Sequence, residues 1–171
     1  TLNSFSLLTA HEQVPGFNAW IVRMATMLSP DLRHTNRVLL EGLRDALTPL
    51  PSTADFVSYM QQLRQQDPLE MRNVVLDELR LRFSRRMSSE ETVLAPDRER
   101  LLNDVQAYLT CVEYTQVDMP FDPVLQAEVH TLLQDAPAVH MLLVSHLATV
   151  WEMFAPEWKR VQSSLRWQVE M

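Results

Sequence analysis

Apolar residues recur three and four positions apart along most of the chain, the spacing that places them on one face of an α-helix. Eight separate stretches of the 171 residues follow this pattern. They run from 17 to 28, 32 to 47, 56 to 63, 69 to 83, 101 to 112, 125 to 133, 139 to 154 and 158 to 165. The pattern predicts an all-α chain of about eight helices, each of which buries its apolar stripe against a neighbour.

Four of the helix starts are marked by a capping residue with a proline just behind it. Proline suits the first turn of a helix because the N–H that it lacks would have no partner there. The side-chain oxygen of Ser or Asp accepts a hydrogen bond from the backbone of the same turn. The four sites are Ser29-Pro30, Asp67-Pro68, Asp122-Pro123 and Asp135-Ala136-Pro137. Helices are therefore predicted to begin near Pro30, Asp67, Asp122 and Asp135.

Two stretches lack a clear apolar stripe. Residues 85–95 are polar and follow a group of arginines, which predicts a mobile connection, and residues 118–121 read as a turn containing proline. We find no repeat at 30 to 45 residues, so one compact, bundle-like domain over residues 1–171 is expected. Two domains divided near residue 90 are the alternative. The chain starts at Thr1 and stops at Met171 without a helix stop signal, and we expect it to be part of a longer protein.

The composition favours helices and excludes some classes of binding partner. Only 2 glycines are present, too few for the turns of a hairpin-rich fold. The net charge of -7 has the wrong sign for a chain that neutralises phosphates, so no DNA-binding residues are expected in it. No apolar run approaches the length of a membrane span, and the N-terminal residues lack the basic-then-apolar pattern of a signal peptide, which predicts a soluble, cytoplasmic protein without a membrane partner.

Residues for catalysis or metal binding are scarce. The sequence has no glycine-rich phosphate loop, no nucleophile elbow and no zinc-binding histidine pair. Cys111 is the only cysteine, and the five histidines are scattered; His140 and His146 fall on nearly opposite faces of one helix. We therefore expect no enzyme activity, no catalytic residues, no metal site and no cofactor.

Trp20, His146 and Trp151 are the candidates for a ligand pocket. Helical bundles build such pockets between facing helices, and tryptophan suits a flat or greasy ligand. Ordinary core packing is the alternative for both tryptophans, and a hydrogen-bonded core histidine is the alternative for His146. The arginines Arg80, Arg82, Arg85 and Arg86 form either a solvated face or an anion contact.

Trp158, Val161 and Leu165 are the candidate contact of a homodimer. They form a thin apolar stripe on a helix whose other positions are polar, so the helix cannot bury itself fully on its own domain. A two-fold interface would cover the stripe, and tryptophan is a favoured anchor there.

Two regions resemble one branch of bacterial regulators of the ArsR type. The first carries Leu7-Leu8, His11, Gly16-Phe17, Trp20, Leu28-Ser29-Pro30, Leu32 and Asn36-Arg37-Val38. The second carries Leu132-Leu133, Pro137, His146-Leu147, Val150-Trp151 and Phe154-Ala155-Pro156-Glu157-Trp158. In those proteins the second region immediately precedes the winged helix-turn-helix, whereas residues 47–119 contribute nothing to the resemblance.

The resemblance implies a helical sensing or dimerising region of a transcription regulator. The DNA-binding winged helix is then expected after residue 171, outside this chain, and DNA is a partner only through that module. A small-molecule effector is a further expected partner, with no effector identified. The Cys-x-Cys pair of the metal sensors in that family is absent. A helical scaffold for protein interactions, or a small all-α enzyme, are the alternative functions.

Overall fold

The fold of the described residues is entirely helical. The computed structural model describes residues 19–44, 47, 55–87, 94–116 and 120–169. Within them the regular elements are α2 (Ala19–Met27), α3 (Pro30–Gly42), α4 (Phe56–Gln65), α5 (Pro68–Met87), α6 (Arg98–Asn103), α7 (Val105–Thr115), α8 (Pro123–Leu133) and α9 (Ala136–Val169). This confirms the predicted all-α class with about eight helices.

The four predicted helix starts are confirmed by the capping bonds. Ser29 Oγ accepts from the backbone N–H of Leu32 at 3.2 Å. Three aspartates accept in the same way from the first turns of their helices, at 2.8 to 3.1 Å; they are Asp67, Asp122 and Asp135. Each cap satisfies a backbone donor that the helix itself cannot pair.

The prediction of one helix from 101 to 112 is wrong. The chain breaks at Asp104, which ends α6 and caps α7 by accepting from the backbone N–H groups of Gln106 and Ala107 at 3.0 and 3.1 Å. Because of the break, the two halves of the stripe do not share one face: Leu101 is buried, whereas Val105 is 42% exposed.

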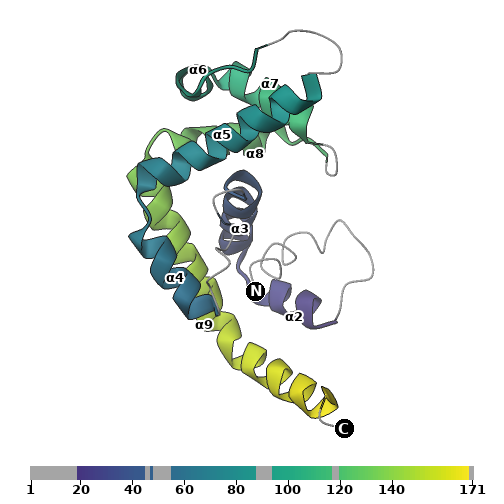
Figure 1. Cartoon of the computed structure of the whole chain (residues 1–171). Coiled ribbons are helices and arrows are strands. Elements are labelled where there is room, and N and C mark those ends of the chain that lie inside the picture. Colours follow the sequence, from purple (N-terminus) through teal and green to yellow (C-terminus); the bar gives the residue numbers. More distant parts are fainter. Residues whose placement is uncertain (1–18, 45–46, 48–54, 88–93, 117–119, 170–171) are drawn as a thin grey trace.

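The prediction of a separate helix from 158 to 165 is also wrong. Helix α9 continues without interruption from Ala136 to Val169 and contains Pro156. The proline removes the hydrogen bond to the carbonyl of Glu152. Both residues are exposed, so water can solvate that carbonyl. Figure 1 shows that the axis of α9 changes direction between the part that packs on the body and the part that projects from it, as expected of a helix with an internal proline.

The connection predicted from residue 85 begins later than expected. Residues Arg85 to Met87 still belong to α5, and residues 94–97 lead into α6. Residues 88–93 of the connection and residues 118–119 of the turn expected at 118–121 lie outside the described part of the chain.

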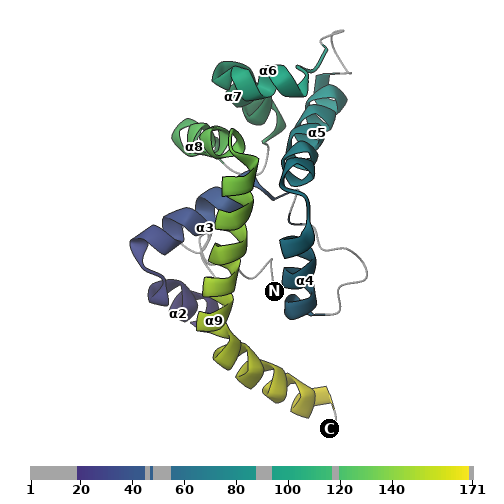
Figure 2. The same ribbon diagram turned by 90° about the vertical axis from the view of Figure 1, so that its left-hand side faces the viewer.

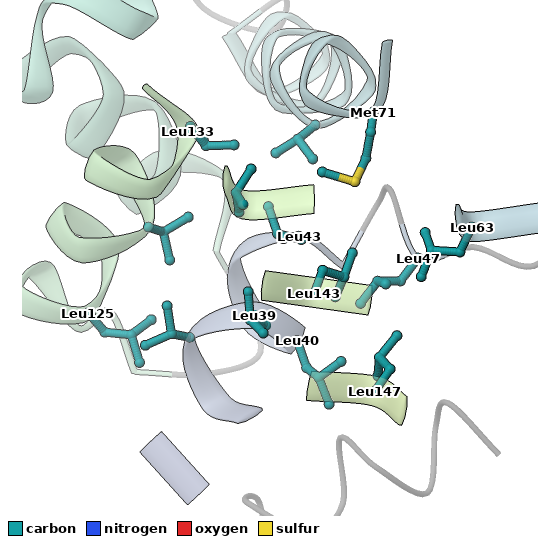
Figure 3. Packing of buried hydrophobic residues seen from close by; sticks show 14 of the residues in the cluster. Leu39, Leu40, Leu43, Leu47, Leu63, Met71, Leu125, Leu133, Leu143 and Leu147 are labelled. Carbon is teal, nitrogen blue, oxygen red and sulfur yellow. The ribbon is translucent and has the colours of Figure 1, made fainter. Parts of the chain in front are cut away.

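The hydrophobic core is centred where α3 lies between α8 and α9. Figure 3 shows Leu39 and Leu40 of α3, and Leu43 directly after it, among leucines of the neighbouring helices, and all three are at most 5% exposed. The core continues along α9 through Leu143 and Leu147 to Phe154 and reaches α5 through Met71 and Leu76. Figure 2 shows α9 running along the molecule, with α3 and α8 on one side and α4 and α5 on the other.

Helices α3 and α8 approach each other closely at Gly42. A Cβ atom at this position would lie 2.5 Å from both methyl carbons of Val129. Valine has little freedom to rotate on a helix, so the methyl groups cannot move aside cheaply. Glycine at position 42 therefore sets the distance between the two helices.

Helix α9 also contains a long apolar segment. Residues Ala136–Pro156 are long and apolar enough to cross a membrane by length and composition, and 33% of that window is buried inside the protein. The core helix of a soluble protein meets the same criteria, and the buried side of this segment, including Leu143 and Leu147, belongs to the core. The segment is thus a single, weak candidate for a membrane span among the described helices.

Candidate functional site

His146 lies inside the core and forms a polar pair with Asn36. Its Nε2 donates to Asn36 Oδ1 at 3.0 Å, which joins α9 to α3. The two residues are 4% and 0% exposed. Burial penalises the charged imidazolium and lowers the pKa of His146 to about 4. His146 is therefore neutral near pH 7 and has the geometry of a hydrogen-bonded core histidine, the alternative reading of the sequence.

Asn36 was missed as a candidate site residue, although the sequence contains a signal for it. It stands four residues after Leu32 and three before Leu39, so it occupies a core position of that stripe. A polar residue at such a position needs a hydrogen-bond partner when it is buried. The same reasoning that singled out His146 therefore applied to Asn36.

Trp151 lies one and a half turns after His146 on α9 and packs against α4. Its ring centroid is 4.6 Å from that of Phe56, with the planes tilted by 32°. Trp151 is partly buried against the core. The side chain of Trp20 lies outside the described residues, so the expected pocket of Trp20, His146 and Trp151 stays a prediction.

The other described histidines bind neighbouring helices. His34 Nε2 on α3 lies 2.9 Å from a carboxylate oxygen of Glu128 on α8. His140 Nε2 donates to the carbonyl of Leu63 at the end of α4 at 2.7 Å, and His130 Nε2 donates to the carbonyl of Leu101 at 3.0 Å. No group of three or more His, Cys, Asp or Glu that could hold a metal ion occurs among the side chains that the structure describes.

A polar layer from α8 covers the break between α6 and α7. His130 and Gln134 donate to the carbonyls of Leu101 and Leu102, which belong to the last turn of α6, where carbonyls commonly need partners from outside the helix. In the same layer Tyr108 donates to Gln126 Oε1 at 3.4 Å, and its ring lies against that of His130. The layer therefore provides hydrogen-bond donors for carbonyls at the end of α6 and holds α8 against that end.

The arginines near the end of α5 hold the following chain segments. Arg80 donates to the carbonyl of Pro96 at 2.8 Å, and Arg86 donates to the carbonyl of Tyr114. Asp77 pairs with Arg98 as well as with Arg80, and these bonds lower the pKa of Asp77. Arg82 is partly buried, and burial together with the charge of Arg44 lowers its pKa. Arg80 and Arg86 thus bind backbone carbonyls of this chain.

Cys111 has the environment of an unreactive thiol. It is 1% exposed in the interior face of α7, and burial raises the pKa of its thiol to about 11. The thiolate is the nucleophilic form, so little of it is present near neutral pH.

Positions 158, 161 and 165 belong to the same continuous helix as the buried Phe154, which they follow by four, seven and eleven residues. Figure 1 shows that this part of α9 projects away from the other helices. The side chains of Trp158, Val161 and Leu165 lie outside the described ones, and their role as a dimer contact stays a prediction.

Comparisons of the chain with family models, with curated proteins and with solved structures found no match.

Proposed function

We propose that this chain is the helical regulatory region of an ArsR-like transcription regulator in the bacterial cytoplasm. In this proposal the region dimerises or binds a small effector, and thereby sets the spacing of two DNA-binding winged helices that follow residue 171. The resemblance in the sequence is the basis for naming the regulator class.

The observation that carries the proposal is the course of α9. The helix begins at Ala136 in the core, contacts α3, α4, α5 and α8, and then continues to Val169 beyond them. Figures 1 and 2 show its far half projecting from the body as the last element of the chain. A change in how α3 or α4 packs on α9 would therefore move the segment to which a following module is attached.

The two regions of the resemblance also lie against each other. Asn36 belongs to the first region and His146 to the second, 110 residues apart, and their side chains form the buried bond between α3 and α9. The Phe154–Trp158 run of the second region spans the point at which α9 leaves the body: Phe154 is the last described buried residue of the helix. The resemblance thus covers the core contact and the exit of the connecting helix.

A fusion protein tests the proposal. We would join the 171-residue chain to a monomeric winged-helix domain and measure its affinity for DNA with two half-sites and with one half-site. A regulatory region that dimerises should raise the affinity for the two-site DNA by about tenfold or more, because the second half-site is then bound at high effective concentration. Affinity for the single half-site should not change.

An equal affinity of the fusion and of the isolated winged-helix domain for the two-site DNA, with and without a panel of cell metabolites, would reject the proposal.

A further inference from the structure

Helix α9 has an outward face that is exposed, uncharged and partly apolar. We define this outward face by the residues Ala138, Met141, Leu142, Ser145 and Thr149, all of which are exposed. Met141 is 69% exposed and Leu142 is 36% exposed, although Leu142 belongs to a predicted core stripe. The opposite face of the same helix carries the core residues Leu143 and Leu147. Helix α9 therefore has apolar residues on both sides, and only one side is covered.

The outward face has no formally charged side chain. None of the 16 residues from Ala136 to Trp151 is Asp, Glu, Lys or Arg, in a chain in which these residues make up 22%. Helices at a protein surface normally carry charged residues on the side facing water. Burying this face against a partner would remove no ionised group from water, a step that costs several kcal/mol for each unpaired ion.

No described helix lies over the outward face. Figure 2 shows α9 in front of the neighbouring helices along this part of its length. Only 33% of the apolar window Ala136–Pro156 is buried. Contiguous exposed apolar surface of this kind marks an interaction site in a soluble protein.

The spacing on the outward face is that of a helix seam. Ala138, Leu142, Ser145 and Thr149 follow one another at intervals of four, three and four residues, which is the heptad spacing of helices that pack side by side. Three of the four are small, so the backbones of two helices can approach closely, and Met141 flanks the seam as a flexible apolar contact. A helix with the same uncharged seam is the complementary surface.

We propose that a second copy of this chain docks on the outward face, with the α9 helices of the two copies packed side by side. The outward face of one copy would then pack against the same face of the other copy around a two-fold axis. This deepens, and rests on, the proposed function, because paired α9 helices bring their projecting halves, and whatever module follows them, into one assembly.

The charge distribution disfavours the other classes of occupant. Residues 101–158 contain eight Asp or Glu and no Lys or Arg, and the described part of this stretch comprises the end of α6, α7, α8 and the packed part of α9. Such a surface repels the anionic headgroups of a membrane and the phosphates of nucleic acid. Two copies also repel each other there, so salt should strengthen the association by screening the acidic groups around the neutral seam.

The size of the seam sets the expected strength. The stretch from Ala138 to Thr149 spans about 18 Å of helix, and a stable interface buries about 800 Å² on each partner. One helix face supplies less than this area. The dimer should therefore be weak, with a dissociation constant in the micromolar range.

Sedimentation equilibrium of the full 171-residue chain and two variants tests the interface. Met141→Glu puts a charge on the outward face. Val124→Glu is the matched control, because Val124 is a 78% exposed apolar residue on α8. The wild type should form dimers at micromolar concentration, and more of them at high salt. Met141→Glu should weaken the dimer by about tenfold or more, because it replaces an apolar interface contact beside the seam by a charge that the interface would bury, while Val124→Glu should not weaken it. Circular dichroism of both variants verifies that they are folded.

Three results would overturn the proposal. The first is a wild-type chain that is monomeric at high micromolar concentration in high salt. The second is a dimer that Trp158→Ala dissociates and Met141→Glu does not, which places the contact on the projecting half of α9. The third is a monomer that binds vesicles of neutral phosphatidylcholine through Met141.

The fusion protein separates this interface from the proposed function. A Met141→Glu fusion that keeps the full gain in affinity for two-site DNA rejects the α9 seam and leaves the regulatory role standing. A chain that dimerises through Met141 but gives no gain in the fusion leaves the interface standing and rejects the regulatory role.

Discussion

Asn36 and His146 each interrupt an apolar stripe, and each satisfies the polar group of the other. Both are buried, so replacing either one by an apolar residue leaves its partner without the hydrogen bond between α3 and α9. A buried polar group that loses its partner costs about 1–3 kcal/mol. The pair therefore favours the one alignment of α3 on α9 in which the two side chains meet.

The depressed pKa of His146 predicts that acid destabilises the fold. In the unfolded chain the imidazole takes up a proton as the pH falls below about 6.5, whereas in the folded protein it stays neutral down to about 4. Between these values the unfolded state binds more protons, so the free energy of unfolding decreases as the pH falls, by up to about 1.4 kcal/mol per pH unit from this group. Below about pH 4 both states are protonated and the loss ends.

Urea unfolding of the wild type and of His146→Gln at a series of pH values measures this contribution. The variant should lose less stability than the wild type between pH 6.5 and 4. Above pH 7 the difference between the two proteins should not depend on pH, because His146 is neutral in both states there, which serves as the internal control. Parallel curves between pH 6.5 and 4 would show that His146 does not titrate as described.

At the scale of single residues, the sequence shows which positions interrupt an apolar stripe, but it does not show which residue each of them contacts in the fold. His146 stands out because it interrupts an apolar stripe, whereas Asn36 interrupts one in the same way and was missed. Their pairing joins residues 110 positions apart, and no local pattern contains that information. The close approach of Gly42 to Val129 is likewise a property of two helices that meet only in the folded chain.

At the scale of helices, the starts were predictable because capping is local. Each predicted start combines a capping side chain and a proline within three residues, and the structure has the capping bond at all four. The break at Asp104 was missed because apolar spacing continues across it from Leu102 to Val105. The continuity of α9 through Pro156 was missed because proline usually ends a helix, whereas here it lies at an exposed position where the lost bond is solvated.

The cap at Asp104 should contribute measurably to stability. Its carboxylate accepts from two backbone N–H groups at the start of α7, and no other described residue takes this role. Asp104→Ala should lower the free energy of unfolding by about 1 kcal/mol. Asp104→Asn keeps an accepting oxygen and should retain most of the stability. Urea denaturation of the three proteins measures these free energies of unfolding. An equal decrease in the two variants would mean that the hydrogen bonds of the side-chain cap contribute nothing to stability.

At the scale of the whole molecule, negative charge is concentrated in one part of the sequence. Residues 101–158 carry eight acidic and no basic side chains, whereas 12 of the 15 basic residues lie before residue 101. Several of those arginines are bound to this chain: Arg80 and Arg98 to Asp77, and Arg37 to Glu41 and Asp122. The part of the sequence that forms α7, α8 and the packed part of α9 therefore combines an excess of acidic residues with the neutral seam of α9.

This distribution predicts that the 171-residue chain does not bind DNA with sequence specificity. A protein gains most of its affinity for DNA by neutralising phosphates, and a net charge of -7 with an uninterrupted acidic stretch opposes that gain. A gel-shift assay at low salt with sub-micromolar chain should show no retained DNA, while the winged-helix fusion serves as the positive control. Retention that distinguishes one DNA sequence from another and survives a rise in salt would place a DNA-binding element inside this chain. Charge reversal at Arg85 and Arg86, the exposed arginines at the end of α5, would then show whether that element is the arginine cluster.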